Sequence, residues 1–95
     1  MTVPEGLPSA VVAMMKERLA RLQPLSLDIA DESALHAGHA GAASGGGHYR
    51  MRIVSPMFAG APTIARHRMV YDAFGAMMKR EIHAVSITAK TPDET

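Results

Sequence analysis

The sequence predicts an α+β domain in which two helices cover one face of a three-stranded mixed sheet. Segments with helical and strand-like periodicity follow one another in the order α-β-β-α-β, and 95 residues are enough for one core and no more. The second helix lies between the last two strands and can act as the crossover that parallel strands require. We therefore expect the last two strands to be parallel and the first two to be antiparallel.

Both helices are predicted from apolar residues that recur at helical spacing. The first is expected over residues 8–22, where Pro24 ends the pattern. The second is expected over residues 64–80, with Thr63 as its N-cap. The apolar stripe of this second helix is expected to include Ile64, Tyr71, Phe74 and Met78.

Three segments alternate apolar and polar residues and are predicted to be strands. They are residues 25–31, 48–55 and 82–90. In the third segment the alternation places His83 on the same face as Val85. Because alternate side chains of a strand share one face, the apolar set of each strand is expected to face the helices.

We expect one domain over residues 1–95, with its core between residues 8 and 91. Residues 32–47 read as a long loop, because glycine and alanine dominate the connection between the first two strands. Residues 92–95 are polar and are expected to form a frayed tail.

The composition excludes several classes of function. A net charge of +1 gives no strong field toward nucleic acid, so any basic site must be local. No apolar run approaches the roughly 18 residues that span a bilayer, and the N-terminus lacks the basic region of a secretion signal. We therefore expect a cytoplasmic protein with no membrane partner. Without cysteine, the chain could bind a soft metal only through histidine or through the ligands of a partner.

The stretch LHAGHAGAASGGGHY, residues 35–49, holds three of the five histidines and no charged side chain. An isolated histidine is usually structural. His36 and His39, however, lie three residues apart among glycines and can turn toward a common ion. The stretch ends at His48, and His83 opens the last strand. Spacing alone leaves both a metal site and a plain hairpin connection open.

Three further candidates lie near the start of the second helix: Arg66, His67 and Arg68. Cations gain from the helix dipole at the C-terminal end and not at this one. The two arginines are therefore candidates for binding a phosphate or an acidic partner, with a solvated helix face as the alternative. No serine is tied to a histidine and an acid in a catalytic pattern, so we expect neither an enzyme nor a small-molecule substrate.

Four segments together resemble the BolA family. They are DESALHAGHAG, HYRMRIVSPMFAG, ARHRMVYDAF and IHAVSITAKTP, in this order, and the similarity runs from about residue 10 to residue 92. The resemblance implies an α-β-β-α-β fold of class II KH-like topology, which is the order predicted above.

The resemblance also implies a partner. Members of this family pair with monothiol glutaredoxins, and the heterodimer holds a 2Fe-2S cluster through a cysteine and glutathione on the glutaredoxin side. On this chain it implies His83 as one ligand and His36 as the second, with His39 as an alternative, while His48 is interpreted as structural. The cluster is not expected to bind tightly to the isolated chain, and imidazole ligation makes the site acid-labile because the ligand must be deprotonated.

The family's second role concerns DNA. Its members have been treated as transcriptional regulators of stress response and morphology, acting through the helix that here begins near Thr63. This role is the alternative hypothesis, and a protein-interaction module without a cofactor is the third. The low net charge predicts DNA binding that is modest and strongly salt-dependent.

Overall fold

The computed structural model describes residues 6–33 and 47–95. Helix α1 spans Gly6–Leu19 and continues into a 3-10 turn at Ala20–Leu22. Strand β1 follows at Ser26–Asp31, and strand β2 spans Gly47–Val54. These bounds agree with the predicted first helix and first two strands to within about two residues.

The second half holds the second helix and the last strand. After a 3-10 turn at Pro56–Phe58, helix α3 spans Thr63–Phe74 and is extended by a 3-10 segment at Gly75–Lys79. Strand β3 then spans Ile82–Lys90. The predicted N-cap is wrong by one position. Pro62, whose backbone is extended, occupies the N-cap position, and Thr63 is the first residue of the helix.

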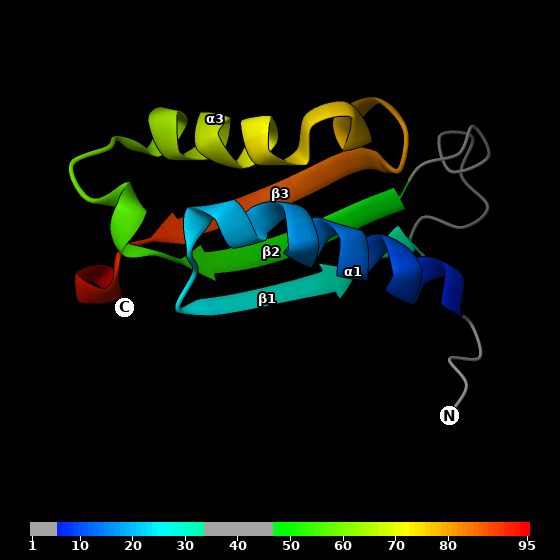
Figure 1. Ribbon diagram of the computed structural model, residues 1–95, viewed down its shortest axis with the longest axis horizontal. Coiled ribbons are helices and arrows are strands. Elements are labelled where there is room, and N and C mark those ends of the chain that lie inside the picture. Colours follow the sequence, from blue (N-terminus) through cyan, green and yellow to red (C-terminus); the bar gives the residue numbers. More distant parts are fainter. Residues whose placement is uncertain (1–5, 34–46) are drawn as a thin grey trace.

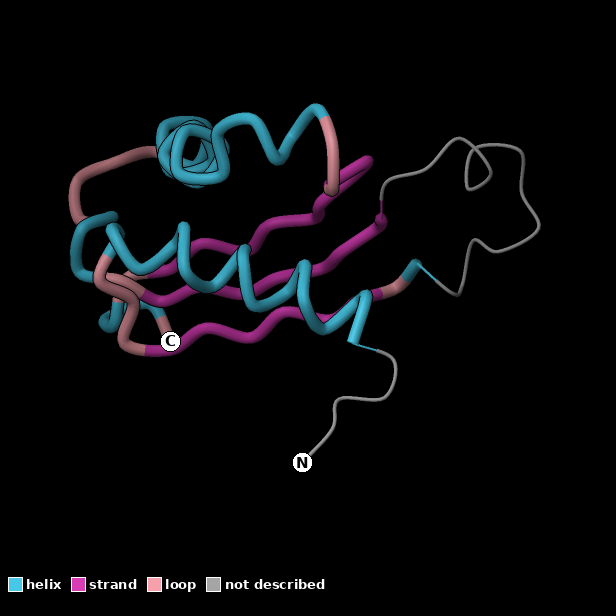
Figure 2. The backbone as a smooth tube through the Cα atoms, turned by 45° about the vertical axis from the view of Figure 1, so that its right-hand side comes forward, coloured by secondary structure: helices cyan, strands magenta, loops and turns pink. Residues whose placement is uncertain are grey.

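The sheet has the order β1-β2-β3, with β1 antiparallel to β2 and β2 parallel to β3. Both helices lie on the same side of these strands, as Figure 1 and Figure 2 show. This confirms the predicted mixed sheet with helices on one face. Alternation along β2 explains the layering, because Tyr49, Met51 and Ile53 are buried while Arg50 and Arg52 are exposed on the opposite face.

The core lies between the helices and the sheet and is built mainly from aliphatic and thioether side chains. Phe58 and Phe74 are its only fully buried aromatic rings in the described chain, so flexible methionines fill much of the remaining space. The predicted stripe of α3 is partly wrong, since Ile64 and Tyr71 are exposed. The core residues are Met15, Leu19, Leu22, Tyr49, Met51, Ile53, Phe58, Val70, Ala73, Phe74, Met77 and Ile82.

The last residues form a 3-10 turn in the segment that the sequence predicted as a frayed tail. Pro92–Glu94 form a 3-10 turn closed by a capping box, in which the Thr91 and Glu94 side chains each bond the other's backbone N–H. The chain therefore ends packed beside the C-terminal end of β3, next to the turn before α3 (Figure 1).

Candidate functional site

The start of β3 carries a bulge, and this bulge decides where His83 points. Gly47 pairs with Ile82 and His48 pairs with Ala84, so His83 is an extra residue that opposes none of β2. An extra residue interrupts the alternation of a strand and redirects a side chain. Ile82 is therefore buried and His83 is exposed, which corrects the prediction that His83 shares the face of the apolar residues.

The redirected His83 lies beside His48 on the neighbouring strand. Their ring centres are 4.9 Å apart, and the ring planes are tilted by 43°. The backbone of His48 is held on both sides, since its N–H donates to the Ser33 hydroxyl at 3.1 Å and its carbonyl accepts from the Glu32 N–H at 2.8 Å. The sheet thus brings together two imidazoles that are 35 residues apart in the sequence.

Gly47 makes room for a buried ring next to this pair. A Cβ at position 47 would lie 2.5 Å from the Tyr49 hydroxyl and 2.6 Å from its ring, well inside contact distance. Burial raises the pKa of the Tyr49 phenol, and the Asp31 carboxylate raises it further. The Tyr49 phenol therefore stays neutral at neutral pH. Gly47 and Tyr49 lie on the buried face of β2, and His48 between them lies on the opposite face.

His36 and His39 lie outside the described residues. Within residues 6–33 and 47–95, no group of three or more His, Asp or Glu side chains is arranged to hold a metal ion. What the described part of the chain offers is the pair of imidazoles at the bulge. The contact between His83 and His48 was not anticipated from the sequence, because this contact depends on the register of two strands.

Arg66 is engaged within the chain. Its Nε donates to the Ala61 carbonyl at 2.7 Å, and one terminal nitrogen donates to the Ala89 carbonyl at 3.1 Å. Both terminal nitrogens bond the Glu94 carboxylate, at 2.6 and 2.9 Å, and the guanidinium lies 6.0 Å from the centre of the Phe58 ring. The Arg66 side chain is only 12% exposed, and its donors are bonded within the chain. These bonds hold the fold together, whereas the sequence suggested a contact between Arg66 and a phosphate.

The Arg66 guanidinium lowers the pKa of Glu94 from its ordinary value of 4.5 to about 2, and the Thr91 backbone N–H adds to this effect. The carboxylate is therefore ionised throughout the neutral range and holds the end of the chain against α3. Of the other two candidates on this helix, His67 is half-buried and Arg68 is exposed. Arg68 therefore remains on the surface as a candidate for binding an anion.

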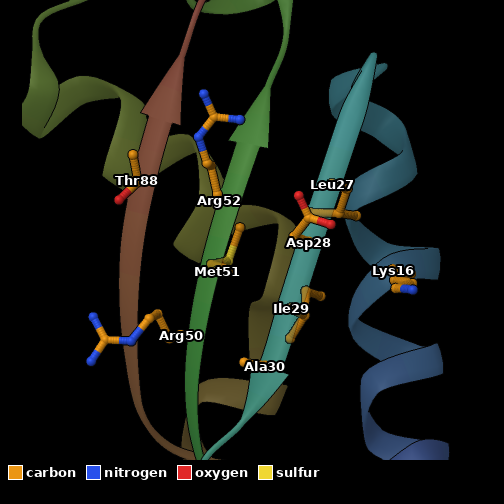
Figure 3. A pocket seen from close by; sticks show the side chains of 9 residues that line it. All are labelled: Lys16, Leu27, Asp28, Ile29, Ala30, Arg50, Met51, Arg52 and Thr88. Atoms are coloured by element: carbon orange, nitrogen blue, oxygen red, sulfur yellow. The ribbon is translucent and has the colours of Figure 1, made fainter. Parts of the chain in front are cut away.

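A shallow hollow of about 430 Å³ opens along β1 and β2 (Figure 3). Of its three cations, Arg52 is paired in register with Asp28, Arg50 bonds Glu32 at 3.0 Å, and Lys16 lies on α1. None of the histidines in the described part of the chain lines it. The hollow is therefore separate from the imidazole pair.

In the described part of the chain, no helix is both long and apolar enough to cross a membrane. This finding agrees with the hydropathy of the sequence.

Residues 19–94 match the sequence pattern of a family described as BolA-like protein. Among curated proteins, the chain is 41% identical over 86 residues to SufE-like protein 1, chloroplastic/mitochondrial, of Arabidopsis thaliana. It is 40% identical over 85 residues to Protein BOLA1, chloroplastic, of the same plant, and 33% identical over 86 residues to DNA-binding transcriptional regulator BolA of Escherichia coli strain K12. The matches cover 84%, 85% and 85% of this chain, and 23%, 53% and 79% of those proteins.

Solved structures of BolA proteins also have the fold of this chain. The BolA domain of SufE1 from Arabidopsis thaliana matches with a TM-score of 0.75 and 40% identity, over 87% of this chain and 93% of that one. The solution structure of BolA1 protein from Mus musculus matches with a TM-score of 0.70 and 36% identity, over 86% and 65% of the two chains. The chain therefore spans about a quarter of the Arabidopsis SufE-like protein and matches its BolA domain.

Proposed function

This chain belongs to the BolA-like protein family, and on that premise we propose that it pairs with a monothiol glutaredoxin and shares a 2Fe-2S cluster with it. In this proposal the protein is an adaptor in cluster trafficking and iron homeostasis. The glutaredoxin supplies a cysteine and glutathione, and this chain supplies nitrogen ligands. The observation that carries the proposal is the exposed His83, turned out of the core by the bulge of β3.

The donor set of this chain fits such a cluster. The sequence contains no cysteine, so nitrogen must replace sulfur on this side. Imidazoles are ligands of one iron in Rieske-type 2Fe-2S centres, where they raise the reduction potential relative to four thiolates. The proposal needs a second nitrogen besides His83, for which the sequence suggests His36 or His39. Because the isolated chain supplies only one side of the site, we do not expect it to hold the cluster tightly.

The test is a spectroscopic titration. Cluster-loaded monothiol glutaredoxin with glutathione is mixed anaerobically with this protein, and visible absorption and circular dichroism are recorded. We expect the wild-type chain to change the dichroism of the cluster and His83→Ala to leave it unchanged. His67→Ala is the matched control, because it removes an imidazole from α3 rather than from the bulge. A spectrum that the wild-type chain does not alter, or that His83→Ala alters as fully as wild type, rules the proposal out.

DNA binding is the second candidate function. It is favoured by the exposed Arg68 on α3 and by the name of the Escherichia coli relative, DNA-binding transcriptional regulator BolA. Arg66 contributes less to this candidate, since Glu94 and two carbonyls bond it. The test is duplex binding across a salt series: loss of one phosphate contact in Arg68→Ala should reduce the salt slope by about 0.9, and an unchanged slope would remove Arg68 from any DNA contact.

Neither candidate gives the chain a catalytic activity, and we propose none. The cytoplasmic location expected from the sequence stays a prediction. The two Arabidopsis relatives carry names that place them in the chloroplast, or in the chloroplast and mitochondrion.

A further inference from the structure

We propose that His48, rather than His36 or His39, is the second ligand that this chain presents with His83. The inference rests on the proposed function and names the ligand that it leaves open. The two rings already lie side by side in the chain by itself, at 4.9 Å between their centres.

The separation of the rings suits joint ligation of one ion. Imidazole nitrogens bond metal ions at about 2.0–2.1 Å, which places the centres of two rings on one tetrahedral ion about 5 Å apart. The tilt of 43° between the planes also matters, because it is far from the parallel stacking of two ring faces. Tilted rings can turn their edges, which carry the nitrogens, toward a common point.

His48 projects from a paired strand, and this favours it energetically as a ligand. His48 is bonded through its backbone to Glu32 and Ser33, and the preceding Gly47 N–H donates to the Glu81 carbonyl at 2.9 Å. A ligand on such a scaffold loses little backbone entropy when it binds. His36 and His39 lie in a sequence with a glycine every few residues, and glycine loses more entropy than any other residue when its backbone is fixed.

The bulge in β3 places the His83 ring beside the His48 ring. If the register of Tyr49 with Val85 and His48 with Ala84 continued without interruption, position 83 would oppose Gly47 and face the core. The shift instead pairs Ile82 with Gly47, and it leaves the His83 side chain exposed beside the His48 ring. Bulges of this kind are over-represented beside functional sites, where they re-aim a side chain.

The experiment counts nitrogen ligands. The heterocomplex with a monothiol glutaredoxin and glutathione is reduced with dithionite, and pulsed electron paramagnetic resonance measures the strongly coupled imidazole nitrogens. We expect two in the wild-type complex and in the double variant His36→Ala, His39→Ala, and at most one in His48→Ala. Two nitrogens in His48→Ala, with one or none in the double variant, would overturn the inference. If His83→Ala also keeps both nitrogens, the proposed function itself fails.

A second variant separates ligation from a structural role. His48→Cys keeps a ligand at this position but changes its chemistry, so we expect one coupled nitrogen and a lower reduction potential. If His48 only supports the strand, His48→Cys will keep two nitrogens and the wild-type potential, which contradicts the inference. Far-UV circular dichroism of each variant is recorded as a control, to check that the secondary structure is that of the wild-type chain.

Discussion

The two ends of strand β3 differ in how they are held. At its C-terminal end, the Lys90 carbonyl accepts from the Ser55 N–H at 2.9 Å and the Ala89 carbonyl accepts from Arg66. Glu94 closes this end by bonding the same arginine. At its N-terminal end, a bulge breaks the pairing with β2 and leaves His83 exposed.

The difference shows how one strand can serve stability and chemistry at once. The closed end is fixed by hydrogen bonds, an ion pair and the buried Phe58 ring. The open end departs from regular pairing and directs an imidazole outward. A functional side chain is best placed on a rigid element, and the closed end supplies that rigidity. Changes at the closed end should therefore cost more stability than changes at the open end, where the candidate site lies.

The largest effect is expected from Phe58→Ala at the closed end. Phe58 is fully buried, and removing its ring leaves a cavity under Arg66. We expect the free energy of unfolding to fall by about 3–5 kcal/mol, measured by urea denaturation followed by far-UV circular dichroism. The control is Met57→Ala, because Met57 is 44% exposed and its loss should cost within about 0.5 kcal/mol. Equal losses in the two variants would contradict the assignment of Phe58 to the closed end.

Ser55→Ala should have the next largest effect. The buried Ser55 hydroxyl donates to the Leu22 carbonyl at 2.5 Å and accepts from the Met57 N–H at 3.0 Å. Without it a buried carbonyl loses its partner, so we expect a loss of about 1–3 kcal/mol in urea denaturation. Ser86→Ala removes an exposed serine of β3 and should be nearly neutral. A Ser55 variant as stable as the Ser86 variant would show that the closed end does not need this bond.

Gly47→Ala tests the open end and should cost about 1 kcal/mol, because the clash falls on the end of the Tyr49 ring, which can shift. We also expect a changed near-UV circular dichroism signal from the displaced tyrosine. Gly60→Ala is the contrasting variant: nothing lies within 4 Å of its added Cβ, and its cost comes from a φ of 79°. An unchanged tyrosine signal in Gly47→Ala would mean that the ring does not confine this position.

The smallest effect concerns pH and the Arg66–Glu94 pair. The pKa of Glu94 lies at about 2 in the folded chain against an ordinary value of 4.5, so its contribution to stability is present above pH 4.5 and is lost as the pH falls toward 2. The difference in thermal midpoint between wild type and Glu94→Gln should be constant from pH 7 to about 5 and then shrink. Asp93→Asn removes a neighbouring carboxylate that forms no ion pair in the described chain, and serves as control. A difference that stays constant down to pH 2 would contradict the assigned partner.

Most of the fold could be predicted because its signals are local. The period of β2, with buried Tyr49 and Met51 on either side of exposed Arg50, identifies the strand and its buried face. The length of the segment between β2 and β3 indicates a crossover and hence parallel strands. Ile64 and Tyr71 were misassigned to the core because an apolar side chain does not by itself show which face of α3 packs against the sheet.

The geometry of the candidate site could not be predicted from the sequence, because it depends on the register between strands. His83 was identified through the family resemblance, but its orientation depends on a one-residue shift of register that no local pattern contains. The contact with His48 follows from that shift. Arg66 and Glu94 are 28 residues apart, and their ion pair depends on how the chain returns past α3 after β3 ends.

The bulge adds one residue to β3 beyond what regular pairing with β2 requires. Ile82 and Val85 both face the helices although three positions separate them, an odd spacing that regular alternation forbids. Remove one residue between them and both would still face inward, with an unbroken ladder. The sheet does not need this residue for its buried face, and its effect is that two successive residues, His83 and Ala84, are both exposed.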